Sequence, residues 1–450
     1  IPAGEHAIIT LRTMLANNTS ANAGLSFANT AQYTFTGIPI TAVTGSTSGS
    51  LLIVEPDIAI AKNVLPNVPP SAGDVLTYSV SLTASGGAGG DNFSDAFDLA
   101  VDDNLSLGLV YVAGSATVDG AGNTITDPTV TGDGINTAQT LSWNLADATA
   151  DIDVVEGSVV TVTYDVLVLD SVLAGQDLTN SANTQWTGLD GVDTNERDGT
   201  GTPAENDYFT GPATTTLTTL DNTAFSKTRT DDTFNSADAN VRIGDQVVYE
   251  LRINLDEGSH SDLEISDVLP PGLQFEQVVS INGDTTAPYS AVAPFTHANI
   301  AAPTVAGNAA TGPTTVTWTL GDITNVSDGN ATNDEFIILY RARPLNNDVF
   351  LQVNSTPLVN TATLDYTIAT GPESLVDNES ITLLQPNLAV SKLAAPAGGD
   401  TVIDANESVT YNVDITNNGL APAYDVVLED VLPLGMRQGG VTTNSITLGA

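Results

Sequence analysis

The sequence predicts an all-β protein built from Ig-like β-sandwiches arranged in tandem. Many short segments alternate apolar and polar residues, which is the pattern of strands with one buried face. Turn signals rich in Gly, Pro and Asn separate these segments, and no long stretch has the period of a helix. The three lysines, Lys62, Lys227 and Lys392, lie 165 residues apart in similar surroundings, which indicates a domain-sized repeat. Together these observations predict a rod-like array of repeats.

The repeat divides the chain into four parts. Residues 1–53 are predicted to be the C-terminal half of a truncated repeat, and residues 386–450 the N-terminal half of a further one. Residues 54–219 and 220–385 are predicted to be complete repeats, called here the first and second units. We therefore interpret the chain as a section of a longer protein.

The predicted strands follow the same order in each repeat. The first half-repeat contributes the segments 7–11, 25–31 and 51–54. The first unit contributes 58–62, 75–82, 97–101, 140–145, 159–169, 178–186 and 214–219. The second unit contributes 223–227, 247–251, 263–267, 315–320, 336–340 and 358–366, and the last half-repeat 388–392 and 409–413. Trp143 and Trp318 hold matching positions among apolar neighbours, so they are predicted to be core residues.

The composition indicates a folded chain with an acidic surface. The net charge is −43, although only 14% of residues are charged, and 41% are hydrophobic, more than in a disordered acidic chain. Such a surface repels nucleic acid and anionic membranes, so we expect neither as a partner, and no apolar run is long enough to span a bilayer. Without cysteine, no disulfide strengthens the units.

Several motifs shared by the repeats resemble a known family. They are the leading strand that ends in lysine, Gly-Asp before a Tyr-centred strand, Asp-Val-Leu-Pro with a following Gly, Asn-Thr-Ala late in the repeat, and Thr-Asn-Asn-Gly at 416–419. This combination resembles the conserved repeat domain of large bacterial and archaeal surface proteins, and the related isopeptide-forming fimbrial and collagen-adhesin B-type domains. The first unit departs from it, because Asp103-Asn-Leu-Ser106 replaces Asp-Val-Leu-Pro. The resemblance implies Ig-like sandwiches, an extracellular location and, in some members, a self-formed Lys–Asn amide crosslink.

Strand parity provides an independent test of the crosslink. Ile58, Ile60 and Lys62 share one face of their strand, so the lysine is expected to point where the core residues point. By the same reasoning, one Asp and one Asn in each complete unit are expected to point toward the core. In the first unit, Asp102 and Asp103 are both candidates for this acid. The predicted sites are Lys62, Asp103 and Asn180 in the first unit and Lys227, Asp267 and Asn360 in the second, with half-sites at Asn29, Lys392 and Asp430.

Burial gives these residues a defined chemistry. It favours the neutral amine of lysine, which is a nucleophile, and the neutral acid of aspartate, which can polarise an amide carbonyl. Lysine and asparagine would then form an amide and release ammonia once, so the chain modifies itself and is not a turnover enzyme. A buried ion pair beside a hydrogen-bonded asparagine, without a covalent bond, is the alternative interpretation.

An acidic loop offers oxygen ligands of the kind that Ca²⁺ takes, although no cofactor is required by the crosslink. The candidate ligands are Asp190, Asp193, Glu196 and Asp198. A second, looser group comprises Asp322, Asp328, Asn330 and Asp334. Neither group has EF-hand spacing, and solvated loop carboxylates are the competing interpretation. Chelator-sensitive thermal stability would distinguish the two.

These observations favour an extracellular structural protein of the cell surface, a section of a fibre, stalk or giant adhesin. The expected partners are neighbouring copies or repeats of the same protein, including half-repeats that complete each other by strand exchange. The alternative is a calcium-dependent adhesin module that binds a sugar or protein, and the sequence identifies no ligand. No nucleophile elbow, phosphate loop or metal-protease motif is present, so we expect no enzyme.

Overall fold

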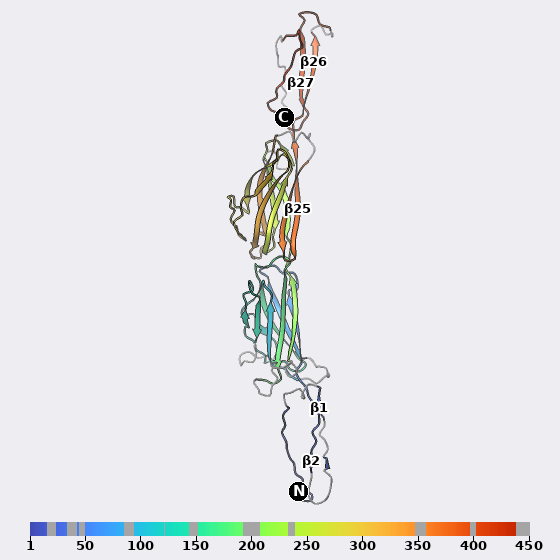
Figure 1. Cartoon of the computed structure of the whole chain (residues 1–450), viewed down its shortest axis with the longest axis vertical. Helices are drawn as coiled ribbons and strands as arrows, with labels where there is room; N and C mark the ends of the chain where they lie inside the picture. Colours follow the sequence, from blue (N-terminus) through green and yellow to red (C-terminus); the bar gives the residue numbers. More distant parts are fainter. Residues whose placement is uncertain are drawn as a thin grey trace.

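The structure of the chain is a computed structural model that describes most of its residues. The described ranges are 1–15, 24–33, 43–44, 50–84, 94–120, 122–143, 152–191, 208–232, 239–346, 357–396 and 402–437. These ranges contain β-strands and no helix, which confirms the predicted all-β, Ig-like class. The two complete units follow one another along the long axis, with β1 and β2 at one end and β26 and β27 at the other (Figure 1).

The first unit is a sandwich of two antiparallel sheets. Each central strand alternates buried and partly exposed residues, as a strand does when one face covers a core. One sheet has the order β5 (Ile58–Leu65), β6 (Val75–Ala84), β12 (Val159–Val168) and β8 (Leu109–Tyr111), and β9 (Thr117–Val118) also pairs with β12. The other has the order β10 (Thr129–Thr131), β11 (Gln139–Trp143), β7 (Phe97–Leu105), β13 (Asp177–Thr187) and β14 (Phe209–Thr218).

The second unit repeats this arrangement. One sheet has the order β15 (Ala224–Asp232), β17 (Val247–Asn254), β23 (Glu335–Pro344) and β19 (Leu273–Ile281). The other has the order β16 (Asn240–Arg242), β25 (Gly371–Leu384), β24 (Pro357–Ile368), β18 (Gly258–Leu269), β22 (Thr314–Asn325) and β20 (Phe295–His297), with β21 (Thr304–Gly307) also paired to β22. All pairings are antiparallel except that of the short edge strand β16 with β25.

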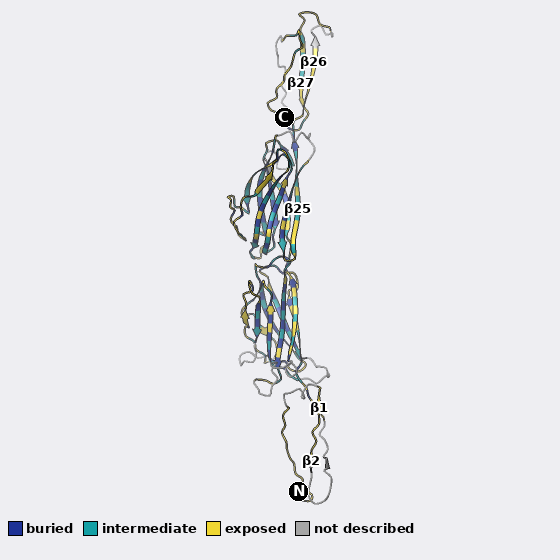
Figure 2. Cartoon of the chain, viewed as in Figure 1, coloured by how far each residue is buried: buried dark blue, intermediate teal, exposed yellow. Residues whose placement is uncertain are grey.

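Each unit encloses its own core. One buried cluster runs from Ile58 to Leu217 and the other from Val241 to Leu383, and they share no residue. In Figure 2 the buried positions concentrate in the strands of these two units, while the described residues at both ends of the chain are mostly exposed. Trp143 and Trp318 are buried in the two cores, which confirms their predicted role.

The two ends of the chain form only short ladders. The pairs are β1 (Ser26–Phe27) with β4 (Leu51–Leu52), β2 (Gln32–Tyr33) with β3 (Val43–Thr44), and β26 (Leu388–Pro396) with β27 (Val409–Asn417). The strand predicted at 7–11 was wrong, because none of these residues joins a ladder and all are exposed. Among the described residues, no second sheet covers β26 and β27, and apolar side chains such as Val390 and Leu393 stay exposed.

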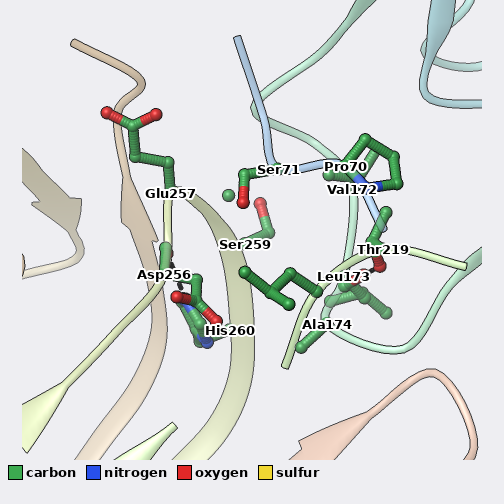
Figure 3. A pocket seen from close by; sticks show the side chains of 12 residues that line it. Pro70, Ser71, Val172, Leu173, Ala174, Thr219, Asp256, Glu257, Ser259 and His260 are labelled. Carbon is green, nitrogen blue, oxygen red and sulfur yellow. Dashed lines mark hydrogen bonds between the residues drawn. The ribbon is translucent and has the colours of Figure 1, made fainter. Parts of the chain in front are cut away.

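The junction between the two units is held by direct hydrogen bonds. The Ser259 amide donates to the Val172 carbonyl oxygen at 2.8 Å, and the Ser259 hydroxyl donates to the Asp170 carbonyl oxygen at 2.8 Å. Gly258 has φ +130°, and a Cβ there would lie 3.0 Å from the Val172 carbonyl oxygen. Only glycine fits this close approach without strain. The cavity at this junction measures about 10 Å³, and Figure 3 shows the side chains that surround it.

Candidate functional site

In the first unit, the predicted Lys, Asp and Asn meet in the core between the two sheets. The Lys62 side chain is 0% exposed and its Nζ donates to Asp103 Oδ2. Lys62 extends from β5 in one sheet, whereas Asp103 and Asn180 extend from β7 and β13 in the other. Asp103 pairs with Ala182, and Asn180 pairs with Leu105, so the acid and the amide are diagonal neighbours on one face. Asp102 is exposed, which leaves Asp103 as the acid at the site.

The second unit reproduces this geometry. Lys227 on β15 is 2% exposed, and its Nζ donates to Asp267 Oδ2. Asp267 on β18 pairs with Ala362 on β24, and Asn360 lies two residues before Ala362 on the same face. Asp267 and Asn360 are both 0% exposed. The two units therefore hold the same three residue types in the same register, although loop lengths between them differ.

A tyrosine hydroxyl completes each cluster. In the first unit, Tyr164 Oη on β12 accepts hydrogen bonds from Lys62 Nζ at 2.7 Å and Asn180 Nδ2 at 3.0 Å, and donates to Asp103 Oδ2. Strand parity and motif spacing did not identify this tyrosine as a member of the cluster. Its signal was present, because Tyr164 lies inward at the centre of the alternating strand 159–169, but parity does not show which groups its hydroxyl reaches.

Tyr340 on β23 has the same role in the second unit. Its hydroxyl accepts from Lys227 Nζ at 3.0 Å and Asn360 Nδ2 at 2.8 Å, and donates to Asp267 Oδ2 at 2.6 Å. Aromatic rings also cover the amine, since Lys227 Nζ lies 5.0 Å from the ring centroid of Tyr249. Lys227 is therefore shielded from solvent inside the core.

Burial sets the protonation of these groups. It lowers the pKa of Lys227 to about 8 and lowers the pKa of Lys62, in both cases against the attraction of the adjacent aspartate. Burial also raises the pKa of Asp103 and Asp267, although the neighbouring lysine opposes the shift. Both shifts favour a neutral amine beside a neutral carboxylic acid.

One oxygen of each acid and each amide lacks a partner. Oδ1 of Asp103, Asn180, Asp267 and Asn360 is buried and accepts no hydrogen bond from any described residue. An unpaired buried acceptor costs about 1–3 kcal/mol, so its repetition in both units is unusual. A proton on the carboxyl group would supply the donor that the amide oxygen needs.

The half-sites differ from the complete ones. Lys392 Nζ contacts both carboxylate oxygens of Asp430 at 2.6 and 2.7 Å, but the two side chains are each 36% exposed. Asn29 is exposed as well. The prediction that these residues face inward was wrong, because no second sheet lies over them within the described residues.

The predicted calcium ligands lie largely outside the described residues. Asp193, Glu196 and Asp198 fall in the undescribed range 192–207, and only Asp190 is described. Within the described ranges, no three His, Asp or Glu side chains are grouped to hold a metal ion. The second group is engaged in loop hydrogen bonds, such as that from Asn325 Nδ2 to Asp334 Oδ1 at 2.8 Å.

Comparisons with known proteins give weak likenesses only. No family model matches the chain, and no curated protein matches it. Among solved structures, BcpA, the major pilin subunit of Bacillus cereus, is 10% identical, with 80% of this chain and 85% of that chain covered and a TM-score of 0.28. The collagen adhesin CNA from S. aureus is 13% identical, with coverages of 80% and 95% and a TM-score of 0.18.

The described part of the chain contains no helix that could cross a membrane. What the chain shows by itself is two successive all-β sandwiches, each with a Lys–Asp–Asn–Tyr cluster between its sheets.

Proposed function

We propose that the chain is a section of an extracellular structural protein, a load-bearing cell-surface fibre, stalk or giant adhesin, whose units lock themselves with Lys–Asn isopeptide bonds. The observation that carries the proposal is the burial of lysine, aspartate and asparagine together in both complete units, bridging the two sheets. A buried ion pair is weak evidence for stability, because desolvation offsets its attraction. Formation of a covalent bond would explain why both units bury these three residues together, whereas an ion pair alone would not.

The reaction follows from the protonation state. Transfer of a proton from Lys62 Nζ to Asp103 leaves an amine with a free electron pair and a neutral acid. The acid polarises the Asn180 carbonyl by hydrogen bonding to its Oδ1, and the amine attacks Cγ. Loss of ammonia then leaves an amide between the two side chains.

The position of the bond explains its mechanical value. Lys62 lies on β5, the first strand of the unit, and Asn180 lies on β13, near its end, in the opposite sheet. The bond would close a loop of 118 residues in the first unit and 133 in the second, counted from Lys to Asn. Force applied along the chain could then not separate the two sheets, and the hydrogen-bonded junction at Ser259 would transmit load between units.

Assembly is the remaining part of the proposal. Neighbouring repeats or copies of the same protein are the proposed partners, because the units stack end to end and hydrogen bonds join them at the junction. The acidic surface argues against nucleic acid as a partner.

The intact mass of the purified chain tests the crosslinks. We expect a mass lower than the sequence sum by two molecules of ammonia, one from each complete unit. Asp103→Ala and Asp267→Ala should each prevent the loss of one ammonia from the intact mass, because the acid that accepts the lysine proton is gone. A mass equal to the sequence sum would contradict the crosslinks, and the chain would then be a series of β domains with buried ion pairs.

A further inference from the structure

In both complete units one tyrosine hydroxyl contacts all three side chains that take part in the crosslinking reaction. Tyr164 Oη lies 2.7 Å from the attacking nitrogen, Lys62 Nζ, and 3.0 Å from the nitrogen that would leave, Asn180 Nδ2. In the second unit Tyr340 Oη lies 3.0 Å from Lys227 Nζ and 2.8 Å from Asn360 Nδ2. The hydroxyl is thus the atom that bridges the two nitrogens.

The hydrogen-bonding capacity of this hydroxyl is fully used. A phenol has one O–H to donate and two lone pairs to accept, and Tyr340 donates to Asp267 while it accepts from Lys227 and Asn360. The neighbouring Tyr78 offers a contrast, because its hydroxyl is buried yet has no hydrogen-bond partner among the described residues. Packing alone therefore does not explain why the hydroxyl of Tyr164 is placed among three polar groups.

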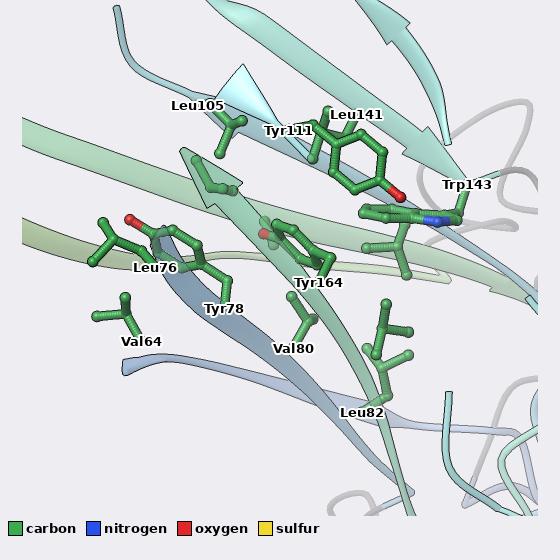
Figure 4. Packing of buried hydrophobic residues seen from close by; sticks show 14 of the residues in the cluster. Val64, Leu76, Tyr78, Val80, Leu82, Leu105, Tyr111, Leu141, Trp143 and Tyr164 are labelled. Carbon is green, nitrogen blue, oxygen red and sulfur yellow. The ribbon is translucent and has the colours of Figure 1, made fainter. Parts of the chain in front are cut away.

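The surroundings keep this phenol neutral. Tyr164 packs among Tyr78, Tyr111 and Trp143, with ring centroids 5.9, 6.3 and 5.2 Å away, and Figure 4 shows these rings gathered around it. Burial raises the pKa of Tyr164 and of Tyr340 well above the ordinary value of 10.0, and the adjacent aspartate adds to the shift. Such a phenol cannot serve as a phenolate base, but it can accept one proton while it releases another.

We propose that Tyr164 and Tyr340 are catalytic residues that relay a proton from the lysine nitrogen to the leaving asparagine nitrogen. This inference rests on the proposed crosslinking function and assigns it a fourth residue in each unit. The aspartate accepts the first lysine proton and activates the carbonyl group, whereas the tyrosine serves the two nitrogens.

In the first unit the four side chains supply every proton that the reaction needs. Lys62 enters as an ammonium and passes one proton to Asp103, which becomes neutral and no longer needs the tyrosine proton. The lone pair of Nζ forms a bond to Cγ of Asn180, and the carbonyl π electrons move to Oδ1. Nζ then gives a proton to Tyr164 Oη as the phenol gives its own to Nδ2. The Cγ–Nδ2 bond breaks with its electron pair on nitrogen and the carbonyl reforms. The products are an amide, ammonia, an Asp103 that keeps the first lysine proton, and an unchanged tyrosine.

Tyr164→Phe and Tyr340→Phe in the full chain test the relay. The chain would be made by cell-free synthesis, samples would be quenched with acid at intervals, and ammonia loss would be followed by intact mass. We expect Tyr164→Phe to slow crosslinking of the first unit by about 100-fold, the lower end of general acid–base contributions, with the second unit unaffected. Tyr340→Phe should do the reverse, so each unit is the control for the other.

Tyr111→Phe is the matched control. Its ring also packs on Tyr164, and its hydroxyl donates to Asp127 Oδ1 at 2.7 Å, outside the cluster. This variant loses one hydrogen bond of the same kind, so it measures the effect of general destabilisation, and we expect the wild-type rate.

A second measurement covers the case in which the phenylalanine variants fail to fold. 3-Fluorotyrosine at position 164 keeps the ring and the hydroxyl but makes the phenol more acidic, so a relay should change rate, whereas a purely structural tyrosine should not. Wild-type rates in both Tyr164→Phe and the fluorinated chain would overturn the relay while leaving the crosslink intact. A wild-type chain that never loses ammonia would overturn the crosslink, and the relay with it.

Discussion

Replacing Asn360 with alanine should remove the second crosslink and lower the stability of that unit substantially. The chain between Lys227 and Asn360 spans 133 residues. Closing a loop of this length restricts the unfolded chain by up to about 5 kcal/mol, by analogy with a disulfide. No separate hydrogen bond from Asn360 Nδ2 to Tyr340 is counted, because that nitrogen has already left as ammonia in the crosslinked unit. For a unit of this size a loss of about 5 kcal/mol corresponds to a fall in Tm of roughly 10–20 °C.

Differential scanning calorimetry of the full chain can resolve this effect. The two cores share no residue, so the transition of the first unit should stay in place and act as an internal reference. In a Lys227→Met background, which has no amine to react, Asn360→Ala should cost only about 1 kcal/mol. The difference between the two backgrounds isolates the covalent bond. If Asn360→Ala abolished one ammonia loss yet moved Tm by less than about 3 °C, the loop-entropy reasoning would be refuted.

Three further predictions concern other positions. Asp103→Ala should prevent the loss of one ammonia, so its intact mass should be higher by one ammonia than that of Asp102→Ala. The reason is that only Asp103 is buried beside the lysine. Equal masses of the two variants would contradict this. Burial lowers the pKa of His260 below its usual 6.5, against nearby Asp256 and Asp221, so the folded state binds this proton less readily than the unfolded state. The free energy of unfolding of the second unit should therefore fall by up to about 1.4 kcal/mol per pH unit between pH 6.5 and the lowered pKa. Denaturant titration of His260→Gln should show a smaller loss over the same pH range. Gly258→Ala should accelerate hydrogen exchange of the Ser259 amide about tenfold by loosening the junction, and unchanged exchange would indicate that the junction tolerates a side chain there.

Strand periodicity was sufficient to predict the sandwich and the inward residues of the complete units. Alternation placed Lys62 on the face of Ile58 and Ile60, and its side chain is indeed fully buried. It likewise placed Asp267 and Asn360 inward on their strands, and both are 0% exposed. These positions were predictable because a period of two fixes the face of every residue once one face is known to be buried.

Other features depend on contacts that periodicity does not encode. Tyr164 Oη bridges Lys62 and Asn180 because of the way the two sheets face each other. The pattern of a single strand does not specify this arrangement. Parity also failed at Lys392, because a face becomes buried only when another sheet covers it. The choice between Asp102 and Asp103 required knowing which face of β7 covers the core, and Asp102 is exposed whereas Asp103 is buried.

The central claim is a covalent bond between two named side chains in each unit, and a digest of the purified chain tests it most directly. Tandem mass spectrometry after cleavage at acidic residues should find branched peptides that join the Lys62 segment to the Asn180 segment and the Lys227 segment to the Asn360 segment, each lacking one ammonia. Linear peptides with unmodified lysine and asparagine at all four positions would contradict the claim.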